Sequence, residues 1–245
     1  MQIKKWLHKI KEGHFWNQAV SVGLLFLVFV SGLNLSGKVV WQRLEREQAR
    51  QERENLAQRV CRKVEPVQEE AGILEQMPDT VIDFEYLLSC NPDTVGWIQI
   101  PGTVIDYPIV QTKENHTYMS RDFYGTERPG GTIFLDYQSQ IPAAQVHCVV
   151  YGHSMKDGSM FRDIARFQDP EYLQAHRVIY LYTPQKTILL EAVSCTWEVN
   201  SRELRRQCLA GEGAGTYVFV TCSYEADDVR TVLWAREVQV QQSEK

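Results

Sequence analysis

Three residue types that together support acyl transfer lie near strand ends in the second half of the chain. Cys222 ends an apolar run that alternates as a β-strand does, and His153 lies just past the end of another apolar run. Arg230 opens the run that follows Cys222. If the runs before and after residues 223–229 pair as antiparallel strands, the connection returns Arg230 to the side of Cys222. One rim would then carry a thiol, an imidazole and a guanidinium.

These three groups fit nucleophilic attack on a carbonyl. The thiolate is the attacking form of cysteine, and a neighbouring histidine takes up or returns its proton. A guanidinium stays charged and can stabilise the oxyanion that forms. Arg236 shares the strand parity of Arg230 but lies six residues further along, about 20 Å at the usual rise, so Arg230 is the arginine within reach. The competing interpretation is a buried thiol, a hydrogen-bonded histidine and a surface arginine without a common role.

The six cysteines are at positions 61, 90, 148, 195, 208 and 222. An even count would allow three disulfides outside the cell, but no two cysteines are closely spaced and the domain is not small. Cys148 and Cys195 fall inside apolar strand runs, where a buried free thiol is the usual state. The sequence leaves the redox state of the five cysteines other than Cys222 open. It contains no CxxC or HxxxH spacing, so we expect no structural zinc.

Short strands dominate the region that must position the three residues. From Thr94 onward, β-branched and aromatic runs alternate with turn residues at the intervals of an all-β protein. The strand runs are VGWIQIPGTVIDYPIV (two strands), GGTIFLDY, QVHCVVYG, RVIYLYT, TILLEAVSCTWEV, TYVFVTCSY and VRTVLWAREVQV, and the helical runs are PDTVIDFEYLLSCNPDT, FRDIARFQDPEYLQAH and SRELRRQCLAGEG. Seven or eight strands with few helices predict a mainly β fold, one closed barrel over residues 93–245.

Composition and charge narrow the class of protein further. The chain has 245 residues, of which 44% are hydrophobic and 23% charged, which excludes a largely disordered chain. Residues 1–63 carry 12 Lys and Arg against five Asp and Glu, a net charge of +7, whereas residues 64–245 carry 14 against 26, a net charge of −12. A basic head on an acidic body indicates a membrane-facing end and argues against nucleic-acid binding.

The N-terminal region has the pattern of a signal anchor. Residues 19–35 read AVSVGLLFLVFVSGLNL without a formal charge, and four lysines precede them. The stretch reaches the minimum length of a spanning helix, and because no A-x-A site follows, an uncleaved anchor is favoured over a cleaved signal peptide. The lysines predict a cytoplasmic segment 1–17, a transmembrane anchor 18–40 and an extracellular body. Residues 41–92 are expected to form a solvated stalk helix and further helices before the barrel.

These segments resemble the sortases, and the class B sortases in particular. The likeness runs from about Asp93 to Val240 and includes VGWIQIPGTVIDYPIVQ, GGTIFLDY, YGHSMKDGSMF around His153, and TCSY followed by Arg230. It implies an eight-stranded barrel and an extracellular cysteine transpeptidase, in the cysteine-peptidase enzyme class, of a Gram-positive bacterium. It also implies that Cys222 is the nucleophile, His153 the acid and base, and Arg230 the group that positions substrate and stabilises the oxyanion. Where the family has the pattern TLxTC, this chain has VFVTC, which retains the threonine and the cysteine.

The reaction implied by the resemblance has two steps and needs no metal or other cofactor. The enzyme would cleave a C-terminal sorting signal of the NPxTx or SPxTG kind after its threonine, through a thioester, and join it to an amine of peptidoglycan or a pilin. The helical insertion near Ser201 to Ala210 is expected to wall the substrate groove. The expected substrate contacts are Ser223, Tyr224 and Glu225 beside the nucleophile, and Tyr182 and Thr183 at a strand end.

Two other functions remain open from the sequence. One is a cysteine endopeptidase on the same fold, which would release surface proteins by hydrolysis. The other is a barrel that binds at the cell surface without catalysis, in which case replacing Cys222 would leave function intact. No residue in the sequence decides between water and an amine as the acceptor.

Overall fold

The computed structural model describes residues 38–63, 80–143, 147–210, 215–222 and 228–242, and the chain divides into two compact units, Met1–Glu52 and Arg53–Lys245. In the first unit, residues 38–52 are helical and almost all exposed. The expected anchor lies outside the described residues apart from positions 38–40. Among the described helices, none is both long and apolar enough to cross a membrane.

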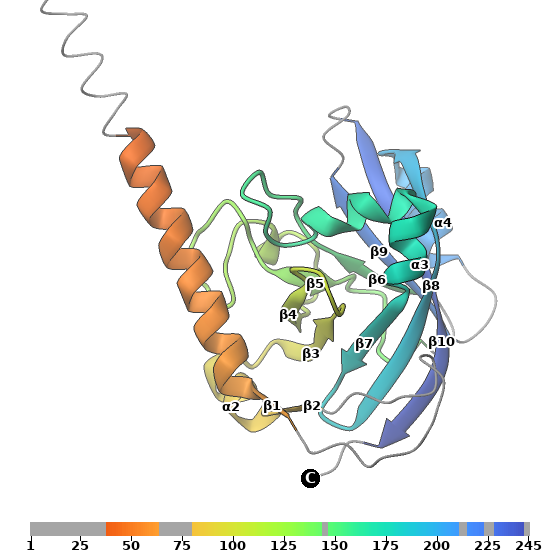
Figure 1. The fold of residues 1–245 in the computed structure, drawn as a ribbon, viewed down its shortest axis with the longest axis horizontal. Helices are drawn as coiled ribbons and strands as arrows, with labels where there is room; N and C mark the ends of the chain where they lie inside the picture. The colour runs from red at the N-terminus through yellow and green to blue at the C-terminus, as the bar shows by residue number, and fades with distance from the viewer. Residues whose placement is uncertain (1–37, 64–79, 144–146, 211–214, 223–227, 243–245) are drawn as a thin grey trace, which may run out of the picture. The chain divides into compact units, whose positions relative to one another are not determined.

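Eight strands of the described part of the second unit close into a barrel, as predicted (Figure 1). Around the barrel their order is β10-β8-β7-β3-β4-β5-β6-β9. The strands are β3 (Thr94–Gln99), β4 (Asp106–Val110), β5 (Ile133–Leu135), β6 (Cys148–Tyr151), β7 (Val178–Tyr182), β8 (Lys186–Val199), β9 (Thr216–Cys222) and β10 (Val229–Gln242). Each corresponds to a strand that the β-branched and aromatic runs of the sequence predict.

Strand direction decides which residues share a rim. β4 pairs parallel with β5 and β6 pairs parallel with β9, whereas the other neighbours in the barrel are antiparallel. The C-terminal ends of β6 and β9 therefore lie at the same rim. β7 runs in the opposite direction, so its C-terminal end lies at the other rim, as the strand arrows in Figure 1 show. The site expected beyond β6 and β9 is thus confined to one end of the barrel.

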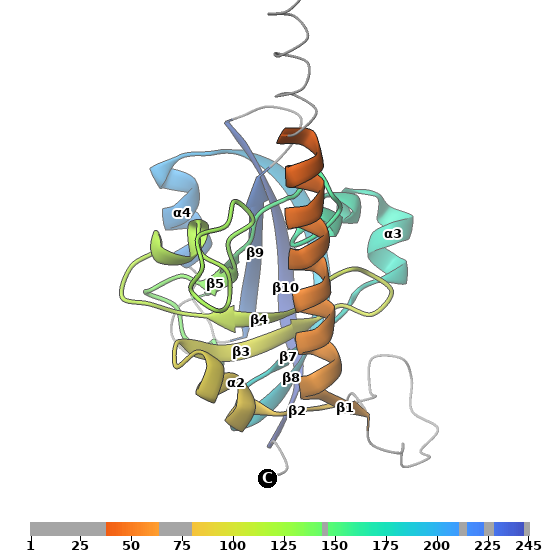
Figure 2. The same ribbon diagram turned by 90° about the vertical axis from the view of Figure 1, so that its left-hand side faces the viewer.

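The two faces of the β9–β10 hairpin have different partners. Tyr217, Phe219 and Leu233 point into the barrel and are fully buried in its main core. On the other face, valines of β6, β9 and β10 pack with Leu204 and Cys208 of α4 (Arg202–Leu209). Figure 2 shows α4 and α3 (Pro170–Ala175) on opposite sides of β9 and β10. A helix inserted between β8 and β9 is thus held against the outside of the barrel.

Helical insertions occur where the sequence predicts them. The run FRDIARFQDPEYLQAH forms a 3-10 helix, η2 (Arg162–Gln168), followed by α3, which begins at Pro170. Proline lacks a backbone N–H and fits the first turn of a helix, and the Asp169 side chain accepts a hydrogen bond from the N–H of Glu171. The proline therefore separates two short helices. A further 3-10 turn, η1 (Thr117–Met119), lies between β4 and β5.

The segment before the barrel differs from the expectation. In the second unit, residues 53–60 are helical, and strand β1 (Cys61–Lys63) follows them directly. β1 pairs with β2 (Thr80–Ile82), which lies in a run expected to be wholly helical, and α2 (Phe84–Cys90) begins only after Asp83. The Asp83 side chain accepts a hydrogen bond from the N–H of Tyr86, which fixes the start of α2. Three-residue strands are too short to show a period, so the sequence pattern missed them.

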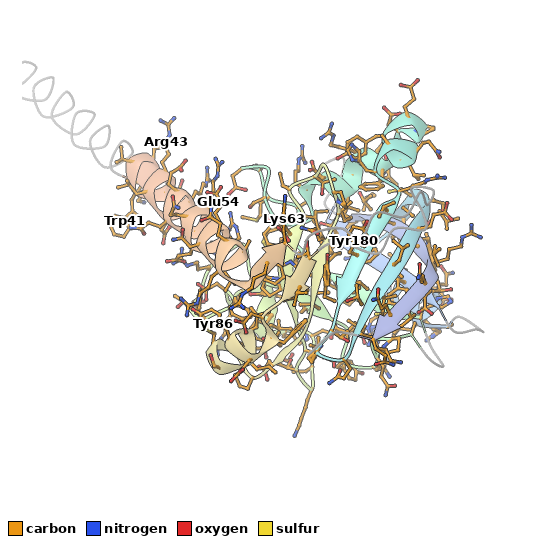
Figure 3. The ribbon with its side chains drawn as sticks, turned by 60° about the horizontal axis from the view of Figure 1, so that its bottom comes forward. Trp41, Arg43, Glu54, Lys63, Tyr86 and Tyr180 are labelled. Atoms are coloured by element: carbon orange, nitrogen blue, oxygen red, sulfur yellow. The ribbon has the colours of Figure 1, made fainter. Side chains whose placement is uncertain are left out.

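The last turns of the N-terminal helix are not a solvated stalk. Leu56 is 4% exposed and Val60 is fully buried, in a cluster with residues of α2, β2, β3 and β4. The Arg59 guanidinium lies 4.0 Å from the centre of the Tyr86 ring, which joins residues 53–60 to α2. Figure 3 labels Tyr86 on α2 and Glu54 on the helix. Leu56 and Val60 are therefore part of the second unit's core, whereas Leu44, in the first unit, is exposed.

Candidate active site

The backbone register places Arg230 directly opposite Cys222 in the β9–β10 ladder. Directly opposed residues of an antiparallel pair project to the same face, with Cβ atoms about 5 Å apart. Arg236 is instead opposite Thr216, and its Nη2 lies 2.6 Å from Oε2 of Glu191. The prediction that Arg230 rather than Arg236 returns to the side of Cys222 is confirmed.

His153 follows β6 at the same level of the barrel. Tyr151 is the register partner of Val220 in the parallel β6–β9 ladder, and the N–H of Gly152 donates to the Val220 carbonyl at 3.1 Å. His153 lies two residues past Tyr151, as Cys222 lies two residues past Val220. Neighbouring strands are about 4.8 Å apart. His153, just past β6, and Cys222, at the end of β9, therefore lie at the same height on adjacent strands.

A close approach of backbone to an aromatic ring explains the glycine before His153. A Cβ atom on Gly152 would lie 2.6 Å from Cδ2 of Phe161, a fully buried residue of the barrel core. The N–H of Phe161 also donates to the His153 carbonyl at 2.8 Å. Glycine thus lets the chain leave β6 against Phe161 and deliver His153 to the rim.

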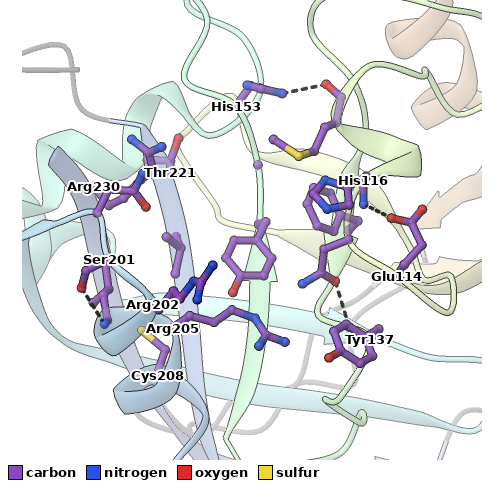
Figure 4. Close-up of a pocket in the computed structure, with 18 of the residues that line it drawn as sticks. Glu114, His116, Tyr137, His153, Ser201, Arg202, Arg205, Cys208, Thr221 and Arg230 are labelled. Carbon is purple, nitrogen blue, oxygen red and sulfur yellow. Dashed lines mark hydrogen bonds between the residues drawn. The ribbon is translucent and has the colours of Figure 1, made fainter. Parts of the chain in front are cut away.

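One hydrogen bond assigns the tautomer of His153. Its Nε2 lies 2.8 Å from the Met119 carbonyl oxygen, which only accepts, so Nε2 carries the proton and donates (Figure 4). In the neutral ring the lone pair is then on Nδ1. Nδ1 is therefore the nitrogen through which His153 can exchange a proton with a reacting group.

A pocket of about 870 Å³ contains both His153 and Arg230. Such a volume is typical of small-molecule and peptide sites. Thr221 lines the pocket too. The floor and one wall of the pocket are apolar, and they are formed by Phe134, Tyr151, Val220, Leu204 and Cys208. The pocket therefore runs from the rim along β6 and β9 and under α4, and the predicted helical insertion forms one of its walls.

A buried carboxylate joins the walls of this pocket. Asp136 is fully buried, and its Oδ2 and Oδ1 each accept from the guanidinium of Arg205 on α4, at 3.0 Å from Nε and 3.0 Å from Nη2. Asn115 Nδ2 donates to Oδ2 at 2.8 Å and the Tyr151 hydroxyl at 3.2 Å, while the N–H of Gln138 donates to Oδ1 at 2.9 Å. Five hydrogen bonds on one carboxylate thus tie α4, β6 and the segments after β4 and β5 together.

Both ends of α4 are capped. The Ser201 hydroxyl accepts from the N–H of Leu204 at 3.0 Å at the N-terminus. Near the C-terminus, His147 Nδ1 donates to the Cys208 carbonyl at 3.0 Å, and its ring packs edge-on against Trp234. Leu204 and Cys208 are one turn apart and face the barrel, so a single helical face carries the packing.

Several of the other cysteines are buried, which makes their thiols less reactive. Cys61, Cys90, Cys148, Cys195 and Cys208 are free in the structure. Burial raises the pKa of Cys208 to about 11, with a further contribution from Glu198, and burial raises the pKa of Cys195 to about 12. Burial also raises the pKa of Cys148. A thiol with a raised pKa is protonated at neutral pH and is a poor nucleophile.

Tyr182 and Thr183, expected to contact substrate, do not line this pocket. They end β7, whose C-terminal end lies at the rim opposite to that of His153. Tyr182 is 2% exposed, and its hydroxyl donates to Gln99 Oε1 at 3.2 Å. The Thr183 hydroxyl donates to the Lys186 carbonyl at 3.0 Å within the β7–β8 turn. A strand end in the sequence does not specify the rim, so the sequence could not show that these two residues lie apart from His153.

Some expected site residues lie outside the described part of the chain, and two residues of the pocket walls were not predicted from the sequence. Ser223, Tyr224 and Glu225 lie outside the described residues, so their expected contacts stay predictions. Asp136 and Arg205 were missed, although an acidic residue directly after the buried strand β5 is an unusual position for a charge. Within the described ranges, no group of three or more His, Cys, Asp or Glu is placed to hold a metal ion.

Comparison with known proteins identifies the fold family. A family model of the sortase domain matches residues 98–238, more than half of the chain. The chain belongs to the sortase family. Within that family, curated relatives include Sortase B of Listeria monocytogenes, 41% identical over 90 residues, and Sortase B of Staphylococcus aureus, 34% identical over 96 residues. The matched segments span 37% of this chain and 37% of the Listeria protein, and 39% of this chain and 39% of the Staphylococcus protein.

Solved structures agree with this class B assignment. The sortase B of Clostridium perfringens is 26% identical, with a TM-score of 0.55 over 64% of this chain and 100% of that one. The sortase B of Bacillus anthracis, solved in complex with AAEK1, is 25% identical, with a TM-score of 0.60 over 80% of this chain and 99% of that one. The chain is thus a class B sortase with the eight-stranded barrel of the family.

Proposed function

We propose that this sortase is a cysteine transpeptidase in which Cys222, His153 and Arg230 carry the reaction. The observation that carries the proposal is the register of three adjacent strands. β9 and β10 bring Arg230 opposite Cys222, and the parallel β6–β9 ladder brings His153 to the same height. The pocket of about 870 Å³ beside them has an apolar floor, which suits the burial of substrate side chains.

In the first step the Cys222 thiolate attacks the carbonyl carbon of a threonine in the substrate peptide. The carbonyl oxygen gains negative charge, which the Arg230 guanidinium stabilises. As the intermediate collapses, the peptide C–N bond breaks, and the imidazolium of His153 gives its Nδ1 proton to the departing amine. The products of this step are a thioester on Cys222 and the released C-terminal fragment.

In the second step an amine attacks the thioester carbonyl. Neutral His153 accepts the amine proton at Nδ1, the C–S bond breaks, and an amide forms as the Cys222 thiolate leaves. Arg230 again stabilises the oxyanion. No redox agent, metal or cofactor takes part in either step, and His153 returns to its starting protonation state.

We further propose the partners that the sequence indicates. The donor is a surface protein with a C-terminal sorting signal of the NPxTx or SPxTG kind, and the acceptor is an amine of peptidoglycan or a pilin. The charge-free stretch and its preceding lysines support a single-pass anchor, with a cytoplasmic N-terminus and the barrel outside a Gram-positive cell. Anchoring at the membrane would hold the enzyme where sorting signals emerge and cell-wall precursors are displayed.

The test is a product analysis with the full-length chain in mild detergent. Peptides of the NPxTx and SPxTG kinds are incubated with glycine-based or diaminopimelate-like amines, and mass spectrometry identifies the products. We expect an amide between the threonine carboxyl and the added amine, and no product with Cys222→Ala. Arg236→Gln is the matched control for Arg230→Gln, since both arginines lie on β10 but Arg236 pairs with Glu191.

Two other outcomes would contradict the transpeptidase. Cleavage that yields only the free acid at saturating amine would show the endopeptidase activity instead. Absence of cleavage for every peptide and amine, with Cys222 unmodified by substrate, would contradict catalysis at this site.

A further inference from the structure

The basic residues of the barrel are concentrated at the pocket. Between residues 80 and 242 the described residues include 13 Lys and Arg and 17 Asp and Glu. Four of the 13 basic residues line the pocket, Lys113, Arg202, Arg205 and Arg230, whereas one of the 17 acidic residues does, Glu114. This excess of positive charge lies on a body whose net charge is strongly negative.

The acidic side chain of the pocket is already engaged. The Glu114 carboxylate accepts hydrogen bonds from the Thr117 hydroxyl and from the N–H groups of His116 and Thr117. The Thr117 hydroxyl, followed by the His116 N–H, lowers the pKa of Glu114. These contacts order the turn after β4 and direct the carboxylate toward its own backbone.

The cations come from two facing walls. Arg202 and Arg205 lie in the first turn and a half of α4, and both enter the pocket (Figure 4). Arg205 is fixed by Asp136 and its side chain remains 36% exposed, while Arg202 is exposed. Lys113 also lines the pocket, in the segment after β4 and next to Glu114, which lies across from α4 in Figure 4. Asp136 offsets the charge of Arg205, so Arg202 and Lys113 carry most of the excess at this end.

The same helix offers an internal comparison. Arg206 follows Arg205 directly but does not line the pocket, and its Nη1 lies 2.7 Å from Oε2 of Glu203 on the surface of α4. Arg205 and Arg206 project about 100° apart around the helix, so Arg205 turns toward the pocket while Arg206 turns away from it toward Glu203. The cations that α4 gives to the pocket are therefore Arg202 and Arg205.

We propose that Arg202, Arg205 and Lys113 form an anionic-residue subsite, which selects a sorting signal with an acidic side chain in the segment bound in this pocket. This inference rests on the proposed function, because it takes the substrate to be a peptide. An Asp or Glu carboxylate between the two walls would gain charge-assisted hydrogen bonds from the guanidinium groups. A lysine at the same position would face like charges.

Binding tests the subsite without the need for turnover. The full-length Cys222→Ala chain is titrated, at low and at 0.5 M salt, with fluorescent sorting peptides that carry Glu, Gln or Lys at each position around the threonine. At one or more positions we expect Glu to bind about fivefold or more tighter than Gln, roughly the effect of one well-placed ion pair. The preference should weaken at high salt, because the pocket is open to solvent.

Variants locate the effect. Arg202→Gln with Lys113→Gln should remove most of the Glu preference, and Arg202→Gln alone should weaken it. Arg206→Gln, which removes one charge from the same helix as Arg202→Gln does, should retain it. Arg205→Gln is a poor test, because it would leave Asp136 buried without its cation. Equal affinities for Glu and Gln peptides at every position, tighter binding of Lys peptides, or no binding of any peptide would each overturn the subsite.

Turnover separates this inference from the proposed function. Wild-type chain that cleaves Glu and Gln peptides with equal kcat/KM would overturn the subsite and leave the transpeptidase standing. A Glu preference in binding without any cleavage by the wild-type chain would support the subsite and contradict the transpeptidase.

Discussion

Replacing Asp136 with Asn tests whether the buried carboxylate holds the walls of the pocket together. Asp136 is fully buried and accepts five hydrogen bonds, two of them from Arg205. The amide nitrogen of Asn must occupy the position of either Oδ1 or Oδ2. At Oδ1 it faces two donors, Arg205 Nη2 and the Gln138 N–H, and at Oδ2 it faces three. Even in the less costly arrangement, with the amide nitrogen at the Oδ1 position, the NH2 group of Asn faces two other hydrogen-bond donors.

The size of the effect follows from what is lost. Removing one partner of a buried ion pair costs about 3–5 kcal/mol, but the Arg205 side chain is 36% exposed and water can solvate it. Two lost hydrogen bonds at a buried carboxylate, one of them charge-assisted, give about 3 kcal/mol of destabilisation. For a chain of this size that lowers Tm by about 6–12 °C.

The assay is thermal and urea-induced unfolding of the full-length chain, with Asp136→Asn beside wild type. Glu203→Gln is the matched control, because it breaks the exposed pair with Arg206 on the same helix and should change stability by less than about 0.5 kcal/mol. In a double-mutant cycle, Asp136→Asn and Arg205→Gln should be clearly non-additive. An Asp136→Asn protein with the Tm of wild type, or fully additive effects, would refute the role of this pair.

Three further predictions concern the reactive rim. At pH 7.5, iodoacetamide should modify Cys222 well before Cys208, Cys195, Cys148 or Cys61, because burial raises the pKa of each of these four thiols; comparable rates at Cys208 by peptide mapping would contradict this. Gly152→Ala should destabilise the chain by about 1–3 kcal/mol and reduce turnover, since the new Cβ would overlap the Phe161 ring; unchanged Tm and kcat would show that the close approach is tolerated. Arg230→Gln should lower kcat about 10²–10³-fold through loss of oxyanion stabilisation, whereas Arg236→Gln should leave it nearly unchanged; equal losses would place the effect outside the rim.

Much of the barrel and its rim could be predicted from local sequence pattern. The β-branched and aromatic runs indicate β3 to β10, and the hairpin between β9 and β10 places Arg230 opposite Cys222. These are short-range relations along single strands or one hairpin, so they do not require the whole topology. The place of His153 just past a strand is also local, but its height beside Cys222 depends on the β6–β9 pairing of distant segments.

Relations between distant segments could not be predicted in this way. Asp136 and Arg205 are 69 residues apart and meet only because α4 folds back over β6. The rim at which Tyr182 lies could not be predicted, because the direction of β7 depends on the order of all eight strands. The β1–β2 pair was not predicted, because each strand has only three residues and the sequence around it is typical of a helix.

The central claim is that Cys222 forms a thioester with the substrate, and trapping that thioester tests it most directly. Full-length chain is mixed with a sorting peptide without added amine, quenched in acid, and weighed by intact-protein mass spectrometry. We expect a mass gain equal to the peptide up to its threonine, mapped to Cys222, which disappears on addition of an amine as the amide product forms. Peptide cleavage with no adduct on Cys222, and at an undiminished rate in Cys222→Ala, would contradict it.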